Sequence, residues 1–235
     1  MSKYNDTIYA LSTPPGKSAI AVIRVSGTGA IKALKKISSI KKPKVGAANL
    51  LFIKHKTTII DQVVAVCYKA PKSFTGEDVV EINCHGGQAV ISKISTTFEK
   101  LGLRLAEPGE FTKRALLNNK IDLVKTESIS DIINAETEKQ REIAIKNLSG
   151  GLSVFTNEIN KSIVRVLANL EAVIDFSDED LPVGMIKKIK EQNKNIIKKI
   201  ETELKYARLS KPIRSGVNVA IIGKPNTGKS SFINF

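Results

Sequence analysis

The stretch Gly223-Lys224-Pro225-Asn226-Thr227-Gly228-Lys229-Ser230 is a complete phosphate-binding loop with the Gly-x4-Gly-Lys-Ser spacing. Apolar residues within Val217–Ile222 precede it and predict a short buried strand, and Ser231, Phe232 and Ile233 begin an apolar pattern typical of a helix. The motif requires this order of strand, loop and helix, which a glycine-rich turn that matches by chance does not have. Residues 216–235 are therefore predicted to be the beginning of an α/β nucleotide-binding domain.

The chemistry of such a loop comes from its backbone and from two side chains. Glycines let backbone N–H groups point at phosphate oxygens, where a helix N-terminus adds favourable dipoles. The Lys229 ammonium would reach the β- and γ-phosphates, and the Ser230 hydroxyl would ligate Mg²⁺.

Composition indicates a globular protein. The chain has 235 residues, and 42% of them are hydrophobic, which is enough for one large or two ordinary cores. The formal net charge of +14 favours either an RNA-facing surface or a solvated lysine-rich exterior. Only seven basic residues are Arg, the better reader of bases, so the charge alone leaves both interpretations open.

Two cysteines, Cys67 and Cys84, are too few for a disulfide framework, and their spacing does not match a metal site. We expect both to be reduced thiols in a core. No charged start followed by an apolar run marks a signal peptide, and no stretch has the roughly 18 apolar residues of a membrane span. The sequence therefore predicts a cytoplasmic protein without membrane contact.

Residues 1–118 alternate short strand patterns with two amphipathic helices, which predicts an α+β domain. The helices are expected around the apolar stripes Ile31-Leu34-Ile37 and Ile91-Ile94-Phe98. The predicted strands are Thr7–Leu11, Ile20–Val25, Leu50–Ile53, Val63–Tyr68 and Val79–Cys84.

Residues 119–215 change to a helical period and predict a helical domain. Thr137 and Gln140 have the spacing of a capping box, and Gly150 with Gly151 indicates a break between helices. The string Asn119-Lys120-Ile121-Asp122 matches the guanine-reading string of GTPases, but it lies about a hundred residues before the phosphate-binding loop instead of after it. We therefore interpret Asp122 as a helix N-cap.

Several further strings follow one another in a fixed order. They are Asp6-Thr7-Ile8, Thr13-Pro14-Pro15-Gly16, Ile23-Arg24-Val25-Ser26-Gly27, Phe74-Thr75-Gly76-Glu77-Asp78-Val79-Val80-Glu81, Cys84-His85-Gly86-Gly87, Pro108-Gly109-Glu110-Phe111-Thr112-Lys113-Arg114-Ala115, Leu117-Asn118-Asn119-Lys120-Ile121-Asp122-Leu123 and Ile174-Asp175-Phe176. Together with the phosphate-binding loop, they closely resemble the tRNA modification GTPases of the MnmE/TrmE family. The resemblance covers essentially the whole chain.

The resemblance implies an N-terminal domain that dimerises and binds a folate, a helical domain, and a Ras-like GTPase domain inserted into the helical one. It implies that the full protein acts with a flavin-dependent partner protein on C5 of the wobble uridine of tRNA. The one-carbon donor would be 5-formyltetrahydrofolate or a related folate, and GTP hydrolysis would drive conformational cycling.

The resemblance also implies binding residues. For folate these are Arg24, Glu81 and Lys120: a carboxylate can accept two hydrogen bonds from the donor edge of a pterin, and the cations suit folate oxygens. The alternative is that these three residues form ordinary ion pairs at a domain surface and bind no ligand. For the GTP phosphates the implied residues are Asn226, Thr227, Gly228, Lys229, Ser230 and Ser231, with Ser230 on Mg²⁺ and Asn226 on K⁺.

The sequence ends at Phe235, before the family's switch and guanine-reading segments. We therefore assign no catalytic residue and expect no GTP turnover by this chain alone. One alternative is an inactive folate-binding dimerisation module, and another is an unrelated P-loop ATPase or kinase with a long N-terminal region.

Overall fold

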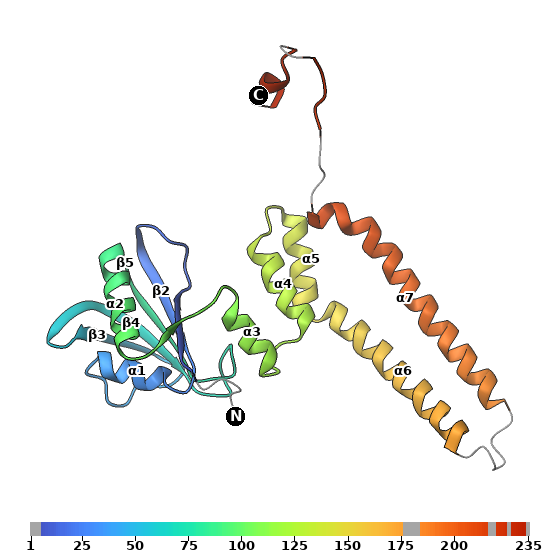
Figure 1. Cartoon of the computed structure of the whole chain (residues 1–235), viewed down its shortest axis with the longest axis horizontal. Helices are drawn as coiled ribbons and strands as arrows, with labels where there is room; N and C mark the ends of the chain where they lie inside the picture. Colours follow the sequence, from blue (N-terminus) through green and yellow to red (C-terminus); the bar gives the residue numbers. More distant parts are fainter. Residues whose placement is uncertain (1–5, 176–183, 216–219, 225–226, 234–235) are drawn as a thin grey trace. The chain divides into compact units, whose positions relative to one another are not determined.

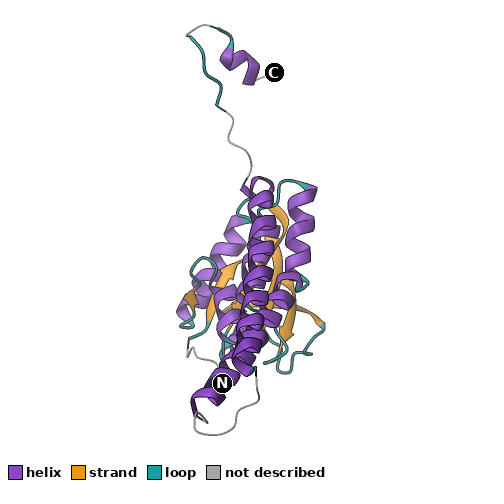
Figure 2. Cartoon of the chain, turned by 90° about the vertical axis from the view of Figure 1, so that its right-hand side faces the viewer, coloured by secondary structure: helices purple, strands orange, loops and turns teal. Residues whose placement is uncertain are grey.

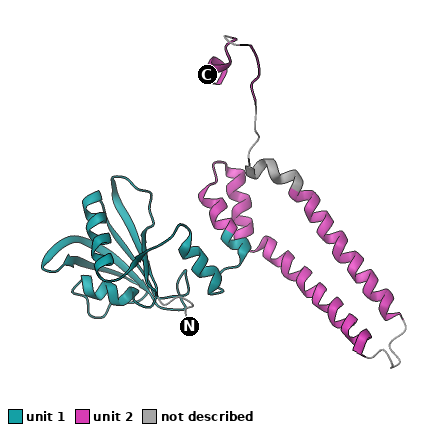
Figure 3. Cartoon of the chain, viewed as in Figure 1, with its two compact units in different colours: residues 1–126 teal, residues 127–235 magenta. Residues whose placement is uncertain are grey.

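The computed structural model describes residues 6–175, 184–215, 220–224 and 227–233. The chain divides into two compact units, Met1–Thr126 and Glu127–Phe235 (Figure 3). Within the described ranges, every strand belongs to the first unit, and the second unit is helical (Figures 1 and 2). The predicted fold class, a mixed N-terminal domain followed by a helical one, is confirmed.

The first unit contains one six-stranded sheet in the order β3-β4-β5-β2-β1-β6. Its strands are β1 (Ile8–Leu11), β2 (Ser18–Ser26), β3 (Ala48–His55), β4 (Thr58–Tyr68), β5 (Val79–Gly86) and β6 (Arg104–Leu105). Only β1 and β6 are parallel; the other neighbours in this sheet are antiparallel. All five predicted strands are present, whereas the two-residue β6 is too short to show a periodic pattern.

Helices α1 (Ala30–Ile37) and α2 (Gln88–Lys100) cover one face of this sheet. Their apolar stripes share a single core with the inward side chains of the strands, because alternate residues of a strand point to the same face. Cys67 and Cys84 lie in this core as free thiols, as predicted. Burial, with a smaller contribution from Asp61, raises the pKa of Cys84 to about 11.

The opposite face of the sheet is different in character. Leu50, Phe52 and Val64 alternate with core residues on β3 and β4, so they point away from the helices, with 70%, 43% and 37% of their surface exposed. Arg24 and Glu81 lie on this same open face of β2 and β5. The sheet therefore has one face buried by helices and one that carries exposed apolar and charged side chains.

Helix α3 (Glu110–Leu117) is held to the sheet by a buried arginine. The Arg114 side chain is fully buried and lies 2.7 Å from Asp6 Oδ1, 3.0 Å from Glu110 Oε1 and 3.3 Å from Glu77 Oε2. Ser26 Oγ on β2 donates to the same Glu77 oxygen at 2.8 Å. A buried charge is tolerated only when it is paired, so these contacts fix α3 against β2 and the loop before β5.

Arg104 extends this network at the surface. Its guanidinium lies 2.7 Å from Asp6 Oδ2 and 2.6 Å from Glu110 Oε1. Hydrogen bonding from Arg104, opposed by burial and assisted by Arg114, lowers the pKa of Glu110 to about 2. For Asp6, burial works in the other direction, but hydrogen bonds from Arg104 and Arg114 leave its pKa below the ordinary value.

The described helices of the second unit that precede the phosphate-binding loop are α4 (Leu123–Ile133), which begins in the first unit, α5 (Glu138–Leu148), α6 (Gly151–Asp175) and α7 (Met185–Ser215). The predicted caps are present: Lys125 N–H donates to Asp122 Oδ1 at 2.8 Å, and Thr137 with Gln140 forms a capping box. Gly150, with φ of 98°, separates α5 from α6.

Helices α6 and α7 pack on each other through narrow apolar seams. Ile189 and Ile196 of α7 are buried, whereas Val164 and Leu167 of α6 remain more than half exposed. Apolar side chains thus remain uncovered on both sides of the seam. No described helix is both long and apolar enough to cross a membrane.

The strand predicted over Val217–Ile222 is wrong for the part that the structure describes; residues 217–219 lie outside the described residues. Its described residues Ala220, Ile221 and Ile222 form no strand, and Ile222 is 92% exposed. A parallel strand is stable only when neighbouring strands take up its hydrogen bonds, and no described strand pairs with this segment. The helix expected after the loop is present as α8 (Lys229–Ile233).

The lowered pKa of Glu110 predicts a pH-dependent stability. The stabilisation, on the order of 3 kcal/mol, is complete above the ordinary carboxyl pKa of about 4.5 and is lost as pH falls toward 2. Glu110→Gln should therefore be less stable than the native chain at pH 7, and the gap should shrink at pH 3. Urea unfolding followed by circular dichroism measures both free energies; a gap of equal size at the two pH values contradicts the assignment.

Candidate binding site

Arg24 and Glu81 are direct cross-strand neighbours on β2 and β5. Arg24 Nε donates to Glu81 Oε1 at 2.9 Å, and Nη2 lies 2.8 Å from the same oxygen. Their side chains remain 27% and 25% exposed. Partly exposed pairs contribute only about 1 kcal/mol or less to stability, so this pair adds little to the stability of the sheet.

Two aromatic rings hold the Arg24 guanidinium in place. Its central carbon lies 5.5 Å from the ring centre of Phe74 and 5.6 Å from that of Phe111. Phe74 comes from the loop before β5, and Phe111 comes from α3. Cation–π contacts at this distance restrict the guanidinium and keep it directed at Glu81.

Phe74 and Phe111 are site residues that sequence reasoning missed. Both belong to sequence strings that resemble the family, but neither residue is implied as a binding residue by that resemblance. Nothing in those strings indicates that rings 37 positions apart meet at one arginine, because that contact is made only when α3 packs on the sheet.

Glu81 and Lys120 line one cavity of about 380 Å³. Its other lining residues are Tyr68, Lys72, Ser73, Phe74 and Val79. Arg24 is joined to this cavity through its ion pair with Glu81 and its contact with Phe74. Two of the three residues predicted for folate thus line one cavity, and the third, Arg24, contacts two of its lining residues, Glu81 and Phe74. The cavity has the size and the mixed aromatic and polar lining of a small-molecule site.

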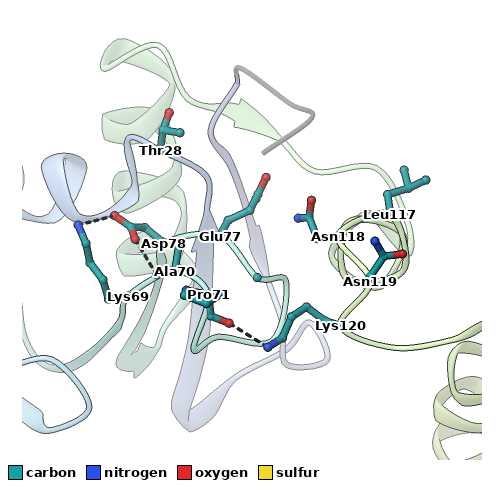
Figure 4. A pocket seen from close by; sticks show the side chains of 11 residues that line it. Thr28, Lys69, Ala70, Pro71, Glu77, Asp78, Leu117, Asn118, Asn119 and Lys120 are labelled. Atoms are coloured by element: carbon teal, nitrogen blue, oxygen red, sulfur yellow. Dashed lines mark hydrogen bonds and ion pairs between the residues drawn. The ribbon is translucent and has the colours of Figure 1, made fainter. Parts of the chain in front are cut away.

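A second cavity, of about 680 Å³, also has Lys120 in its lining (Figure 4). Lys120 Nζ donates to the Pro71 carbonyl at 2.9 Å, and Lys69 Nζ lies 3.3 Å from Asp78 Oδ2. Asn118 and Asn119, from the end of α3, complete one wall. Lys120 therefore lines both cavities and can supply its charge to either.

The backbone beneath Lys120 requires a glycine. Gly76 has a φ of 78°, and a Cβ there would lie 3.0 Å from Lys120 Cγ and 3.3 Å from Asn118 Cβ. Asn118 Nδ2 donates to the Thr75 carbonyl at 2.8 Å, which ties the end of α3 to the same loop. The position of Lys120 thus depends on close backbone approach at Gly76.

The phosphate-binding residues belong to the second unit. Lys229 Nζ donates to the Gly223 carbonyl at 2.8 Å and also to the Lys224 carbonyl, and Thr227 Oγ1 donates to the latter at 2.9 Å. Gly228, with φ of 81°, leads directly into α8, whose first turn contains Ser230 and Ser231. Asn226 lies outside the described residues.

The described side chains do not by themselves form a metal site. The described residues contain no group of three or more His, Cys, Asp or Glu that could hold an ion. An Mg²⁺ ion at Ser230 would therefore take its other ligands from phosphate oxygens and water, which is the usual manner of binding for this ion. Mg²⁺ at Ser230 and K⁺ at Asn226 stay predictions.

The fold and these sites together define a class: a mixed unit with a polar, aromatic-lined cavity, followed by a helical unit that leads into a P-loop. Two family models match the chain, the N-terminus of the GTP-binding protein TrmE over residues 7–120 and the MnmE helical domain over residues 123–228. Together they span most of the sequence. The chain belongs to the MnmE/TrmE family of tRNA modification GTPases.

Individual relatives agree with this assignment. The chain is 42% identical to the tRNA modification GTPase MnmE of Rickettsia prowazekii (strain Madrid E), over 98% of this chain and 52% of that protein. It is 41% identical to the protein of the same name from Aquifex aeolicus (strain VF5), over 97% and 52%. The chain thus spans about half the length of the curated relatives it matches.

Gly76→Ala should disturb the site more than an equivalent change elsewhere. Gly102 has a similar φ of 82°, but a Cβ there would meet nothing within 4 Å, so Gly102→Ala is the matched control. Both variants carry the backbone strain of about 1 kcal/mol or more, and only Gly76→Ala also displaces Lys120 and Asn118. Thermal unfolding should show the larger loss for Gly76→Ala; equal losses would mean that the contact with Lys120 is unimportant.

Proposed function

We propose that the chain is the N-terminal part of a tRNA modification GTPase and that its first unit binds a folate one-carbon donor. In this proposal the full protein acts in the cytoplasm with a flavin-dependent partner protein and modifies C5 of the wobble uridine of tRNA. The observation that carries the proposal is the convergence of Arg24, Glu81 and Lys120 at one aromatic-lined cavity.

The side chains at this cavity fit a pterin. Both Arg24 contacts use Oε1 of Glu81, so the carboxylate retains acceptor capacity at Oε2. The 2-amino group and N3–H of a pterin form a donor edge, and a carboxylate can accept hydrogen bonds from both groups. Tyr68 and Phe74 supply aromatic surface for the flat ring.

The roles of the protein groups follow from their placement. Glu81 would orient the donor edge, while Arg24, in contact with two aromatic rings, holds the Glu81 carboxylate in position through their ion pair. Lys120 would exchange its bond to the Pro71 carbonyl for a folate carboxylate or carbonyl oxygen. A bound folate supplies the one-carbon unit, and these residues would position it.

GTP binding is proposed for the second unit, with Mg²⁺ at Ser230 and K⁺ at Asn226. The order of Gly228, Lys229 and a helix start fits a phosphate cradle. Lys229 is engaged by carbonyls of its own loop, so it must leave them before it can contact β- and γ-phosphates. A second candidate is a folate-binding dimerisation module without GTPase activity of its own; it is supported by the described residues Ala220, Ile221 and Ile222, which form no strand beside the loop.

We also propose a homodimer through the open face of the first unit. Leu50 and Val64 are direct cross-strand neighbours, and Phe52 lies next to them on β3, so they form one exposed apolar patch. Such a patch on an otherwise polar surface is typical of an interface. The patch lies on β3 and β4, and β4 pairs with β5, which carries Glu81, so a second copy would lie beside the folate site.

Phe52→Asp should weaken this dimer, because it places a charge in the apolar patch. Ile222→Asp, at a position 92% exposed in the second unit, is the control. Sedimentation velocity at several concentrations should show a dimer for the native chain and the control, and a monomer for Phe52→Asp. A native chain that stays monomeric at high concentration contradicts the proposal.

Calorimetry with 5-formyltetrahydrofolate tests the folate site. Lys120→Met keeps the side-chain stem over Gly76 and removes the ammonium, and Lys113→Met makes the same change at an exposed position of α3 outside the cavity. The native chain and Lys113→Met should bind, whereas Lys120→Met and Glu81→Gln should lose about 1.5 to 3 kcal/mol of binding free energy, the range of a charge-assisted hydrogen bond. Equal affinities for all four chains would reject the site.

GTP turnover measured on the same samples separates the two candidate functions. We expect folate binding without hydrolysis by this chain. Hydrolysis stimulated by K⁺ would reject the inactive module and leave the GTPase assignment in place.

A further inference from the structure

The first unit contains a long segment without any acidic residue. Between Thr7 and Ile60 the sequence has nine Lys and one Arg but no Asp or Glu. Lysine is common throughout this chain, so the count alone does not define a surface. The fold shows where these charges lie.

Helix α1, the loop that follows it and the β3–β4 turn carry seven of these nine lysines, and helix α2 adds Lys93 and Lys100. We call this set the lysine face: Lys32, Lys35, Lys36, Lys41, Lys42, Lys44, Lys56, Lys93 and Lys100. Each is exposed, and none forms an ion pair with a described carboxylate. Glu99 is the one acid on α2, and it accepts a hydrogen bond from Tyr9. Positive charge on this face is therefore not neutralised locally.

Two observations place these elements together. Both α1 and α2 pack into the same core on one face of the sheet, so their outward sides form a common layer. The β3–β4 turn reaches this layer, because Thr97 Oγ1 of α2 lies 3.3 Å from His55 Nδ1. Desolvation, followed by the charges of Lys93, Lys100 and Lys56, lowers the pKa of His55, as expected for an imidazole close to these cations.

The chemistry of the lysine face favours a polyanion with regularly spaced charges. Lysines are flexible point charges that contact phosphates without reading bases, and releasing counterions from a nucleic acid supplies the binding free energy. Arg is absent from the lysine face, so it would position an RNA rather than select its sequence. It also lies on the side of the sheet opposite Arg24 and Glu81, so RNA and folate would not compete.

We propose that the lysine face is a docking surface for the phosphate backbone of RNA. The choice of tRNA as the RNA rests on the proposed function; the location of the surface does not. Helix α7 offers a comparison, because its exposed lysines are interspersed with Glu191, Glu201 and Glu203. Removing the same number of charges from the lysine face and from α7 therefore shows whether a loss of RNA affinity depends on the lysine face or only on net charge.

The test is fluorescence anisotropy of the full chain with a labelled, unmodified tRNA transcript between 50 and 200 mM salt, a range set by the steep salt dependence of phosphate contacts. The face variant replaces Lys32, Lys36, Lys93 and Lys100 by Gln, and the control variant replaces Lys187, Lys190, Lys194 and Lys198 by Gln. At the lowest salt concentration the face variant should bind at least about tenfold more weakly than the native chain, with its log–log salt slope reduced by about three. The control should stay within about threefold of the native chain.

Several outcomes would overturn the proposal that the lysine face binds RNA. They are no tRNA binding by the native chain, equal weakening in both variants, or stronger binding to phosphatidylglycerol vesicles than to tRNA. Circular dichroism and 5-formyltetrahydrofolate calorimetry on the face variant show whether it is folded. They also report on the folate site separately, so failure of the RNA surface and failure of the proposed function can be distinguished.

Discussion

The buried guanidinium of Arg114 is the constraint on which the first unit depends. It gathers Asp6, Glu77 and Glu110, which come from the N-terminal segment, the loop before β5 and helix α3. Removing one partner of such a buried cluster typically costs about 3 to 5 kcal/mol, because a charge is left without compensation. No described buried side-chain nitrogen or oxygen lacks a hydrogen-bond partner, so the cluster is fully satisfied. The network fixes α3, and α3 in turn carries Phe111 and ends beside Lys120.

The candidate site therefore lies where helix α3 packs against the sheet, a contact that the Arg114 cluster holds in place. Arg24 and Glu81 are placed by strand register, which any one-residue slip would reverse. Lys120 is placed by α3 and by the close approach at Gly76. The two faces of the sheet then differ: the helix-covered face holds the core and its helices carry exposed lysines, whereas the open face carries the candidate folate residues and the apolar patch.

Much of this arrangement could be predicted from the sequence, for physical reasons that are local. Strands such as Val79–Gly86 show period-two patterns, and the caps at Asp122 and Thr137 depend on residues three positions apart. The candidate folate residues came from the family resemblance, not from pattern. The Arg114 cluster could not be predicted, because Asp6 and Arg114 are 108 positions apart. The pattern at Ile221 and Ile222 was that of a strand, but a strand also needs neighbours, which a local pattern cannot supply.

The central claim is that Arg24, Glu81 and Lys120 form one folate site on the open face of the first unit. A crystal structure of the chain with 5-formyltetrahydrofolate tests it most directly. The account predicts the pterin donor edge on the Glu81 carboxylate, beside Phe74 and Tyr68, with Lys120 on a folate oxygen. A folate bound elsewhere, or one that leaves the Glu81 carboxylate without contact, would contradict it.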